Sequence, residues 1–263
     1  MTPVEVADKL DAALSTAESL RDPVKELAHL QAAALEAMNA APANVVLAES
    51  FTKTATSKES DSKKFVKQWR TAIKEARDIL RFEPQEEAPR PEGFPELTPV
   101  GEIRLQQYPK YRLAKTEMTL IEGRAFWTLF NHIKERDIAM TAPVEVTYAS
   151  NEKATKKTSM SFLYRTTEQG SLGPADKVEV VDIPAQTVIS IGIRGTANRD
   201  RVSEARRHLD TWLLAHQDEY ESCGPLRVMS HNSPFVSDSK QYSEVQLPVR
   251  LKDSPAETAP RQD

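Results

Sequence analysis

The sequence predicts an α+β protein that begins with a small bundle of helices. All eight glycines of the 263-residue chain lie at or after Gly93. Residues 1–82 are rich in alanine and lack turn residues, whereas β-branched and aromatic residues between glycines dominate from about residue 100 onward. Alanine favours helices, and β-branched residues punctuated by glycine favour strands joined by turns. We therefore expect a helical domain over residues 1–82 and a domain with an antiparallel sheet over residues 97–250.

The helical domain is predicted from four apolar stripes. In each stripe apolar residues recur every three or four positions, which is the period of a helix with one buried face. The stripes cover residues 6–20, 24–38, 45–51 and 65–80. Asp22 and Pro23 match an N-cap followed by a proline at the first helical position. Four such stripes can bury one another in a bundle.

Residues 83–96 are expected to form a linker between the two domains. The stretch combines prolines with glutamates. Proline lacks the backbone donor and disfavours helix in the residue before it, and glutamates stay hydrated. We expect this linker to be semi-extended and exposed.

The second domain is predicted to pack two helices on an antiparallel sheet. Strand-like runs occur before and after each of two helical stretches, so that two similar halves follow one another. The helices are expected at residues 120–135 and 199–216. The strands are expected around residues 103–105, 111–113, 138–148, 159–164, 177–183, 186–193, 226–230 and 242–249. Residues 251–263 are expected to be a disordered tail.

Composition excludes several classes of protein. The apolar runs are far shorter than the roughly 20 residues of a membrane span, and no secretory signal is visible at the N-terminus. A net charge of −4 argues against a nucleic-acid binder that acts mainly through charge. Residues 53–81 are basic, which indicates either the solvated side of an amphipathic helix or a contact with an acidic partner or nucleic acid. The single cysteine, Cys223, excludes an intrachain disulfide, and a cytoplasmic location fits best.

Four segments in order carry a resemblance to a known family. They are Gly101-Glu102-Ile103-Arg104 with the following Gln107-Tyr108-Pro109, then Ala125 to Ile133, then Ile138-Ala139-Met140-Thr141-Ala142-Pro143-Val144, and finally His231-Asn232-Ser233-Pro234. Together they make residues 97–250 resemble the SOUL haem-binding protein family, of which the Met-Thr-Ala-Pro-Val run is the most recognisable stretch.

The resemblance implies a fold and a ligand. The fold would be a tandem repeat of a helix on an antiparallel sheet, which forms a distorted barrel. The ligand would be haem or another porphyrin, bound without a covalent bond. Some relatives have a histidine before the tyrosine of the first strand, where this chain has Gln107. An amide is a poor ligand for haem iron compared with imidazole, so an axial ligand from this position is not expected.

The helix expected at residues 120–135 is the candidate tetrapyrrole site. At about 100° per residue, one flank of it presents Phe130, Trp127, Asn131 and Arg124 in succession. Aromatic rings suit a porphyrin plane, and an arginine suits its carboxylates. The resemblance also implicates residues of this helix in haem contact, and they match Phe130 and Asn131.

His231 is the best candidate for an iron ligand, because it stands in a loop bounded by a proline. The alternative for His231 is a turn residue in contact with solvent. The remaining histidines are interpreted as surface residues: His29 and the three residues His132, His208 and His216 on the two predicted helices.

We expect a soluble, non-enzymatic protein that binds, buffers or carries haem. The sequence has no Ser/His/Asp order, glycine-rich phosphate loop or metal-binding motif. The alternative is a small-molecule effector-binding or protein-interaction module of the same tandem α+β fold. The helical domain is a candidate for binding a protein partner, whereas nucleic acid and membrane are not expected as partners.

Overall fold

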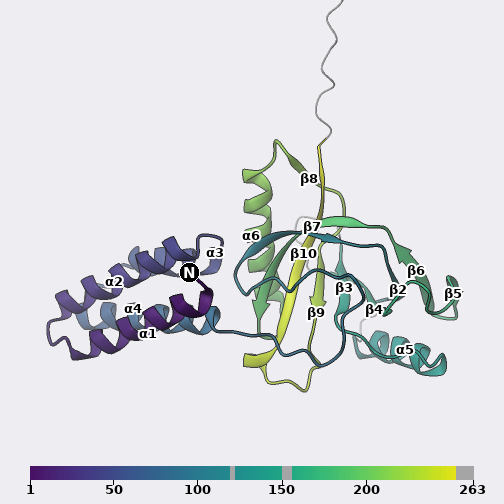
Figure 1. Cartoon of the computed structure of the whole chain (residues 1–263), viewed down its shortest axis with the longest axis horizontal. Helices are drawn as coiled ribbons and strands as arrows, with labels where there is room; N and C mark the ends of the chain where they lie inside the picture. The colour runs from purple at the N-terminus through teal and green to yellow at the C-terminus, as the bar shows by residue number, and fades with distance from the viewer. Residues whose placement is uncertain (119–121, 150–155, 253–263) are drawn as a thin grey trace, which may run out of the picture.

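The computed structural model describes residues 1–118, 122–149 and 156–252 (Figure 1). It consists of a helical region, residues 1–81, beside a sheet region, residues 100–252, and a connecting segment, residues 82–99. The four segments that resemble the SOUL family all lie in the sheet region. That the two regions are separate domains stays a prediction.

Four helices form the helical region, as the apolar stripes predict. They are α1 (Pro3–Ser19), α2 (Pro23–Ala40), α3 (Val45–Ala55) and α4 (Ser62–Leu80). Each begins at a residue whose side chain accepts a hydrogen bond from the first turn, namely Thr2, Asp22, Asn44 and Asp61. Such caps satisfy donors that have no partner within the helix. Apolar residues such as Leu10, Leu30 and Ile73 are buried between the helices.

The described residues of the sheet region form one antiparallel sheet of ten strands. Its order is β1-β7-β10-β9-β3-β4-β2-β6-β5, and β8 pairs with β10. The strands are β1 (Ile103–Tyr108), β2 (Tyr111–Glu117), β3 (Val144–Tyr148), β4 (Lys157–Leu163), β5 (Gly173–Ala175), β6 (Val178–Ile183), β7 (Gln186–Arg194), β8 (Tyr220–Ser222), β9 (Arg227–Ser230) and β10 (Tyr242–Leu251). A short 3-10 helix, η1 (Asp238–Lys240), precedes β10.

Two helices pack on this sheet. Helix α5 (Glu122–Glu135) contacts β2, β4 and β6, and helix α6 (Arg199–Ala215) contacts β7, β10 and β8 (Figure 1). The α+β class with preceding helices is therefore confirmed. The expected barrel is not confirmed, because the pairing of the described strands ends at β1 and β5 without closing. The repeat of two similar halves stays a prediction.

Two expectations from the sequence differ in detail. The strand expected at residues 138–148 begins only at Val144. Ala142 donates its backbone N–H to the carbonyl of Pro89, and the Thr141 hydroxyl donates to the carbonyl of Leu163. These hydrogen bonds are not part of the pairing between neighbouring strands, so the stretch is not a strand. Most of the expected disordered tail lies outside the described residues, and Leu251 belongs to β10.

The connecting segment lies along the sheet region and makes defined contacts there. Phe94 packs edge-on against Tyr108 and Tyr111, with ring centroids 4.8 and 5.2 Å apart. Phe82 stacks on Tyr242 at 6.3 Å. The Thr98 hydroxyl donates to the Glu244 carboxylate at 2.7 Å. The segment is irregular, as expected of a proline-rich stretch, but several of its side chains are part of the packing.

The helical and sheet regions meet at the start of α3. Asn44 is buried, and its side-chain amide donates to the carbonyl of Val100 at 2.9 Å. The backbone N–H of Val45 donates to the carbonyl of Gly101. Val45 and Val46 pack against the apolar cluster beneath α6. The helical region is thereby joined to the sheet by packing as well as by the chain.

None of the helices in residues 1–118, 122–149 and 156–252 is long and apolar enough to span a membrane.

Candidate functional site

Helix α5 is held on the sheet by one apolar face. Ala125, Leu129 and Ile133 are buried and recur every four residues, so they share one side of the helix. They pack against apolar residues of β2, β4 and β6, including Phe162 and Val180. This packing fixes which side of α5 remains available to a ligand.

The available flank of α5 carries an exposed tryptophan supported by two phenylalanines. The Trp127 side chain is 60% exposed, whereas Phe126 and Phe130 are half-buried. The Trp127 ring meets both phenylalanines edge-on, with centroids 5.7 Å from Phe126 and 5.5 Å from Phe130. Phe126 also packs against Phe162 of β4 at 5.2 Å. The aromatic group is therefore anchored in the core at one end and faces solvent at the other.

The polar residues expected at the site lie on the same helix. Arg124 and Asn131 are both exposed. Among the described residues, no acidic side chain forms an ion pair with Arg124. An exposed arginine one turn from an aromatic surface can pair with a carboxylate of a ligand. The structure thus keeps Arg124, Trp127, Phe130 and Asn131 on one element.

His132 is buried, and the expectation that it is a surface residue is wrong. It is 4% exposed, and its Nε2 lies 2.9 Å from the hydroxyl of Tyr164. Burial lowers the pKa of His132 below its usual value, and the nearby Arg136 lowers it further. The helical wheel could not show this, because Tyr164 lies 32 residues away, directly after β4.

His231 is enclosed beside a carboxylate. Its side chain is 3% exposed, and its Nε2 lies 3.1 Å from Oε2 of Glu244 on β10. The ring also packs against Tyr242. Burial would raise the pKa of Glu244, but hydrogen bonds from His231 and Thr98 outweigh it, so this pKa lies below its usual value. A turn residue in contact with solvent is therefore not what the structure shows, and the role of His231 as an iron ligand stays a prediction.

Part of the face of the sheet opposite α5 and α6 is polar, whereas another part of it is apolar. Side chains alternate between the two faces of a strand, so Glu145 and Arg227 point away from the apolar layer that contains Val146 and Val228. Arg227 is 5% exposed and donates to the Tyr111 hydroxyl at 2.5 Å and to Glu145 at 3.3 Å.

Sequence reasoning missed this buried polar group. Arg227 follows Leu226 in a short apolar run and looks there like an ordinary outward residue of a strand. Its Nη2 atom and the Ser161 hydroxyl, also on this face, have no hydrogen-bond partner among the described residues. In the register of β9 and β3, Arg227 lies opposite Thr147 and diagonal to Glu145 on the same face, and only this register shows that the two charged residues are neighbours.

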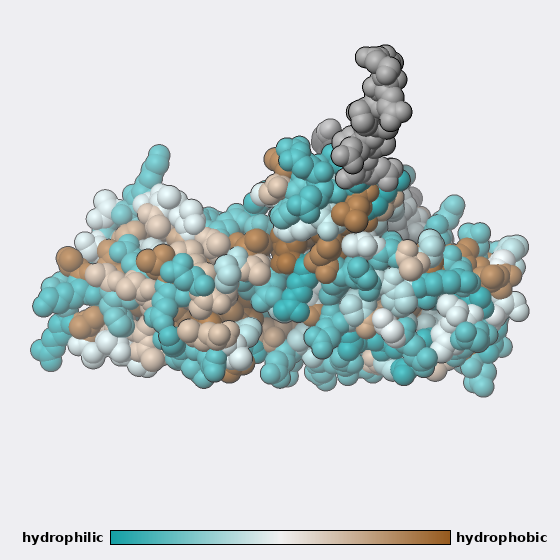
Figure 2. Space-filling view, turned by 45° about the horizontal axis from the view of Figure 1, so that its top comes forward, coloured by the Kyte–Doolittle hydropathy of each residue, from teal (hydrophilic) through white to brown (hydrophobic). Residues whose placement is uncertain are grey.

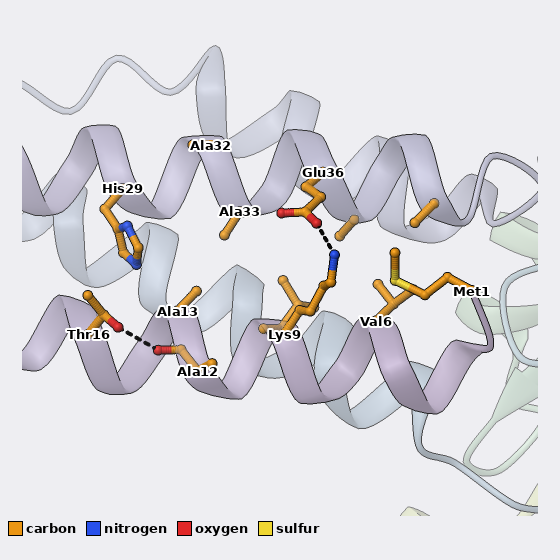
Figure 3. Close-up of a pocket in the computed structure, with 13 residues that line it drawn as sticks. Met1, Val6, Lys9, Ala12, Ala13, Thr16, His29, Ala32, Ala33 and Glu36 are labelled. Carbon is orange, nitrogen blue, oxygen red and sulfur yellow. Dashed lines mark hydrogen bonds and ion pairs between the residues drawn. The ribbon is translucent and has the colours of Figure 1, made fainter.

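A groove of about 340 Å³ lies between α1 and α2 (Figure 3). Six of its 13 lining residues are alanines, and an ion pair of Lys9 with Glu36 crosses it. His29 borders the groove from α2, and it is half-buried rather than a surface residue as expected. Figure 2 shows the pale-brown colour of such apolar residues over the helical region.

The fold and the flank of α5 define an α+β protein with an exposed aromatic surface. The model of the family described as "SOUL heme-binding protein" matches residues 97–248, which is more than half of the chain. The chain therefore belongs to the SOUL haem-binding protein family, as the four segments of the sequence predict. The match covers the sheet region with its aromatic flank, and it leaves the helical region outside.

Solved structures resemble this chain only distantly. The C-terminal domain of EcmrR is 16% identical, with a TM-score of 0.44 over 57% of this chain and 97% of that chain. An uncharacterised conserved protein from Listeria innocua is 12% identical, with a TM-score of 0.45 over 58% and 94%. A hydrolase from Listeria innocua is 12% identical, with a TM-score of 0.42 over 62% and 94%. No curated protein matched the chain in sequence.

Proposed function

We propose that the protein binds haem or a related tetrapyrrole, without a covalent bond, on the flank of α5 formed by Arg124, Trp127, Phe130 and Asn131. The observation that carries this proposal is the exposure of Trp127 above Phe126 and Phe130. A porphyrin is a broad apolar plate, and covering such a ring with it removes apolar surface from water. Membership in the family supports the class of ligand.

Arg124 would pair with a carboxylate at the edge of the porphyrin. It stands on the solvent side of the aromatic group and is not neutralised by a described acidic residue. Asn131, on the next turn beyond Trp127, would add a neutral hydrogen bond. The protein would then bind, buffer or carry the ligand.

Iron ligation is a separate question from binding. His231 bonds to Glu244 on β10, whereas the proposed porphyrin contacts are on α5. Gln107 is exposed on β1. We therefore expect haem and zinc protoporphyrin to bind with affinities within about tenfold of each other, roughly 1.4 kcal/mol. A much larger preference for haem, lost in His231→Ala, would instead make His231 the iron ligand.

The test of the site is a haemin titration followed by the Soret band. Covering most of an aromatic side chain is worth roughly 1.5–3 kcal/mol, so Trp127→Ala should weaken binding by about tenfold or more. Phe235→Ala is the matched control, because Phe235 is 95% exposed and far along the chain from α5. Equal affinities of the two variants would contradict the proposed placement.

A second candidate function is binding of a small polar molecule on the polar part of the sheet face opposite α5 and α6. The unpartnered Nη2 of Arg227 and hydroxyl of Ser161 favour it, because buried polar atoms are normally hydrogen-bonded. This candidate corresponds to an effector-binding module. It takes precedence if the parent protein shows no saturable Soret shift with haemin.

A further inference from the structure

Three metal-binding side chains meet where the helical region touches α6. Glu49 comes from α3, and Glu204 and His208 come from α6. One ligand atom from each residue lies within 4.8 Å of the others. His208 Nε2 is 3.1 Å from Glu49 Oε2. Neither the family match nor the proposed tetrapyrrole site includes this cluster, because Glu49 lies outside the matched residues.

The arrangement fits the chemistry of a transition-metal ion. Glu204 and His208 are four residues apart on a helix, so they project from the same face. One imidazole and two carboxylates are ligands that Zn²⁺ accepts, with water completing its shell. The His208 side chain is 8% exposed, which gives one ligand a fixed position, while Glu49 is 42% exposed and Glu204 is exposed. The site is thus built on one rigid group and two adjustable ones.

Arg207 now occupies part of this cluster. Its Nη2 donates to Glu49 at 2.5 Å and lies 3.4 Å from His208 Nε2. The hydrogen bond from Arg207 is the largest cause of the lowered pKa of the Glu49 carboxyl. The charges of Arg207, His208 and Lys53 lower it further. The Arg207 side chain is 52% exposed, so it can turn into solvent. A bound ion would replace its guanidinium as the positive partner of Glu49.

We propose that Glu49, Glu204 and His208 bind a divalent transition-metal ion, with Zn²⁺ as the best match, and that this ion joins α3 to α6. Its ligands come from both regions of the chain, so binding would fasten the helical region to the sheet region. The ion would act alongside Asn44 and Val45, which already connect the start of α3 to the sheet region. This proposal does not depend on tetrapyrrole binding.

The experiment measures zinc affinity by competition with a chromogenic chelator. It uses the full chain carrying Cys223→Ser, because Cys223 is exposed and thiols bind zinc. Glu204→Gln removes one exposed ligand without disturbing the core, and it should weaken zinc binding by about tenfold or more. Arg207→Ala removes the competing cation and should strengthen zinc binding by about threefold or more. His208→Ala should abolish it.

Asp210→Asn is the matched control for Glu204→Gln. Asp210 is an exposed acid on the same helix that pairs with Arg206 instead of the cluster. Melting curves in the presence of a chelator show whether each variant is folded. The proposal is overturned if Glu204→Gln binds zinc as tightly as Asp210→Asn, if Arg207→Ala weakens binding, or if the parent binds no zinc.

Discussion

Trp127 and Arg124 differ in the kind of energy that each would contribute to a ligand. Trp127 is a large apolar ring held in place by Phe126 and Phe130, so it loses little conformational freedom when a plate covers it. Arg124 is a flexible exposed cation, and its contribution depends on how far the ion pair is removed from water. The contributions of the two residues to ligand binding can therefore be distinguished by measuring affinity at different salt concentrations.

Arg124→Ala should weaken haemin binding less than Trp127→Ala does, and its effect should shrink as salt is added. An exposed ion pair is worth under about 1 kcal/mol and is screened at high ionic strength. The measurement is the haemin affinity of parent and variant at low and high salt. Arg199→Ala is the control, because Arg199 is an exposed arginine on α6. A loss that stays constant with salt would show that Arg124 acts through packing.

His132 should make the stability of the protein depend on pH below about 6.5, the usual pKa of histidine. Burial lowers the pKa of His132 in the folded state, so the unfolded chain binds its proton first. The free energy of unfolding then falls as the pH drops below the unfolded pKa of His132. Urea unfolding at several pH values measures this slope. His132→Gln should flatten it.

The environments of the histidines could not be predicted from local sequence. Helical wheels place His132 and His208 away from the apolar stripes, yet both are buried against partners on other elements. Tyr164 holds His132, and Glu49 lies beside His208 from 159 positions earlier in the chain. Trp127 and Arg124 were placed on an exposed flank because that inference needed only the helix period.

Helices were easier to predict than the strands between them. Each helix of the helical region has both an apolar stripe and a capping residue, and these signals are local. Strands β5 and β8 have three residues each, too few to show an alternating pattern. Residues 138–142 look like a strand because they are apolar, but they bond to the connecting segment and to β4.

The connecting segment should contribute to the stability of the sheet region through Phe94. Its ring meets Tyr108 and Tyr111 edge-on, and the two tyrosines lie beside Arg227. Because Phe94 is half-buried, Phe94→Ala should cost about 2 kcal/mol, below the usual range for a fully buried phenylalanine. Phe235→Ala should change stability by under about 0.5 kcal/mol. Urea unfolding compares the two variants, and equal midpoints would show that the segment lies on the sheet without stabilising it.

At the scale of the whole molecule, the sheet separates two kinds of surface. One face is apolar and is covered by α5 and α6, and the other combines a small apolar cluster with the buried polar residues Arg227, Glu145 and Glu244. The connecting segment reaches this second face through Thr98 and Phe94. Alternating side chains along a strand predict that the sheet has two different faces. They cannot show which chain segment covers the face opposite the helices, because that depends on contacts between residues more than 100 positions apart.

The junction between the two regions should depend on Asn44. Its side-chain oxygen caps α3 by accepting from Leu47, and its amide donates to the buried carbonyl of Val100. Loss of a cap costs about 1 kcal/mol, and an unpaired buried carbonyl costs a further 1–3 kcal/mol or so, so Asn44→Ala should destabilise the protein by about 2–4 kcal/mol.

Asn39→Ala is the control for that change, because Asn39 is exposed near the end of α2. Thermal unfolding measures the overall effect, and hydrogen exchange of the backbone amides in α3 locates it. These amides should exchange faster in Asn44→Ala, since both the first turn of α3 and its attachment to the sheet region are weakened. If the melting temperature falls but exchange in α3 keeps the parent rates, Asn44 stabilises the chain without joining its two regions.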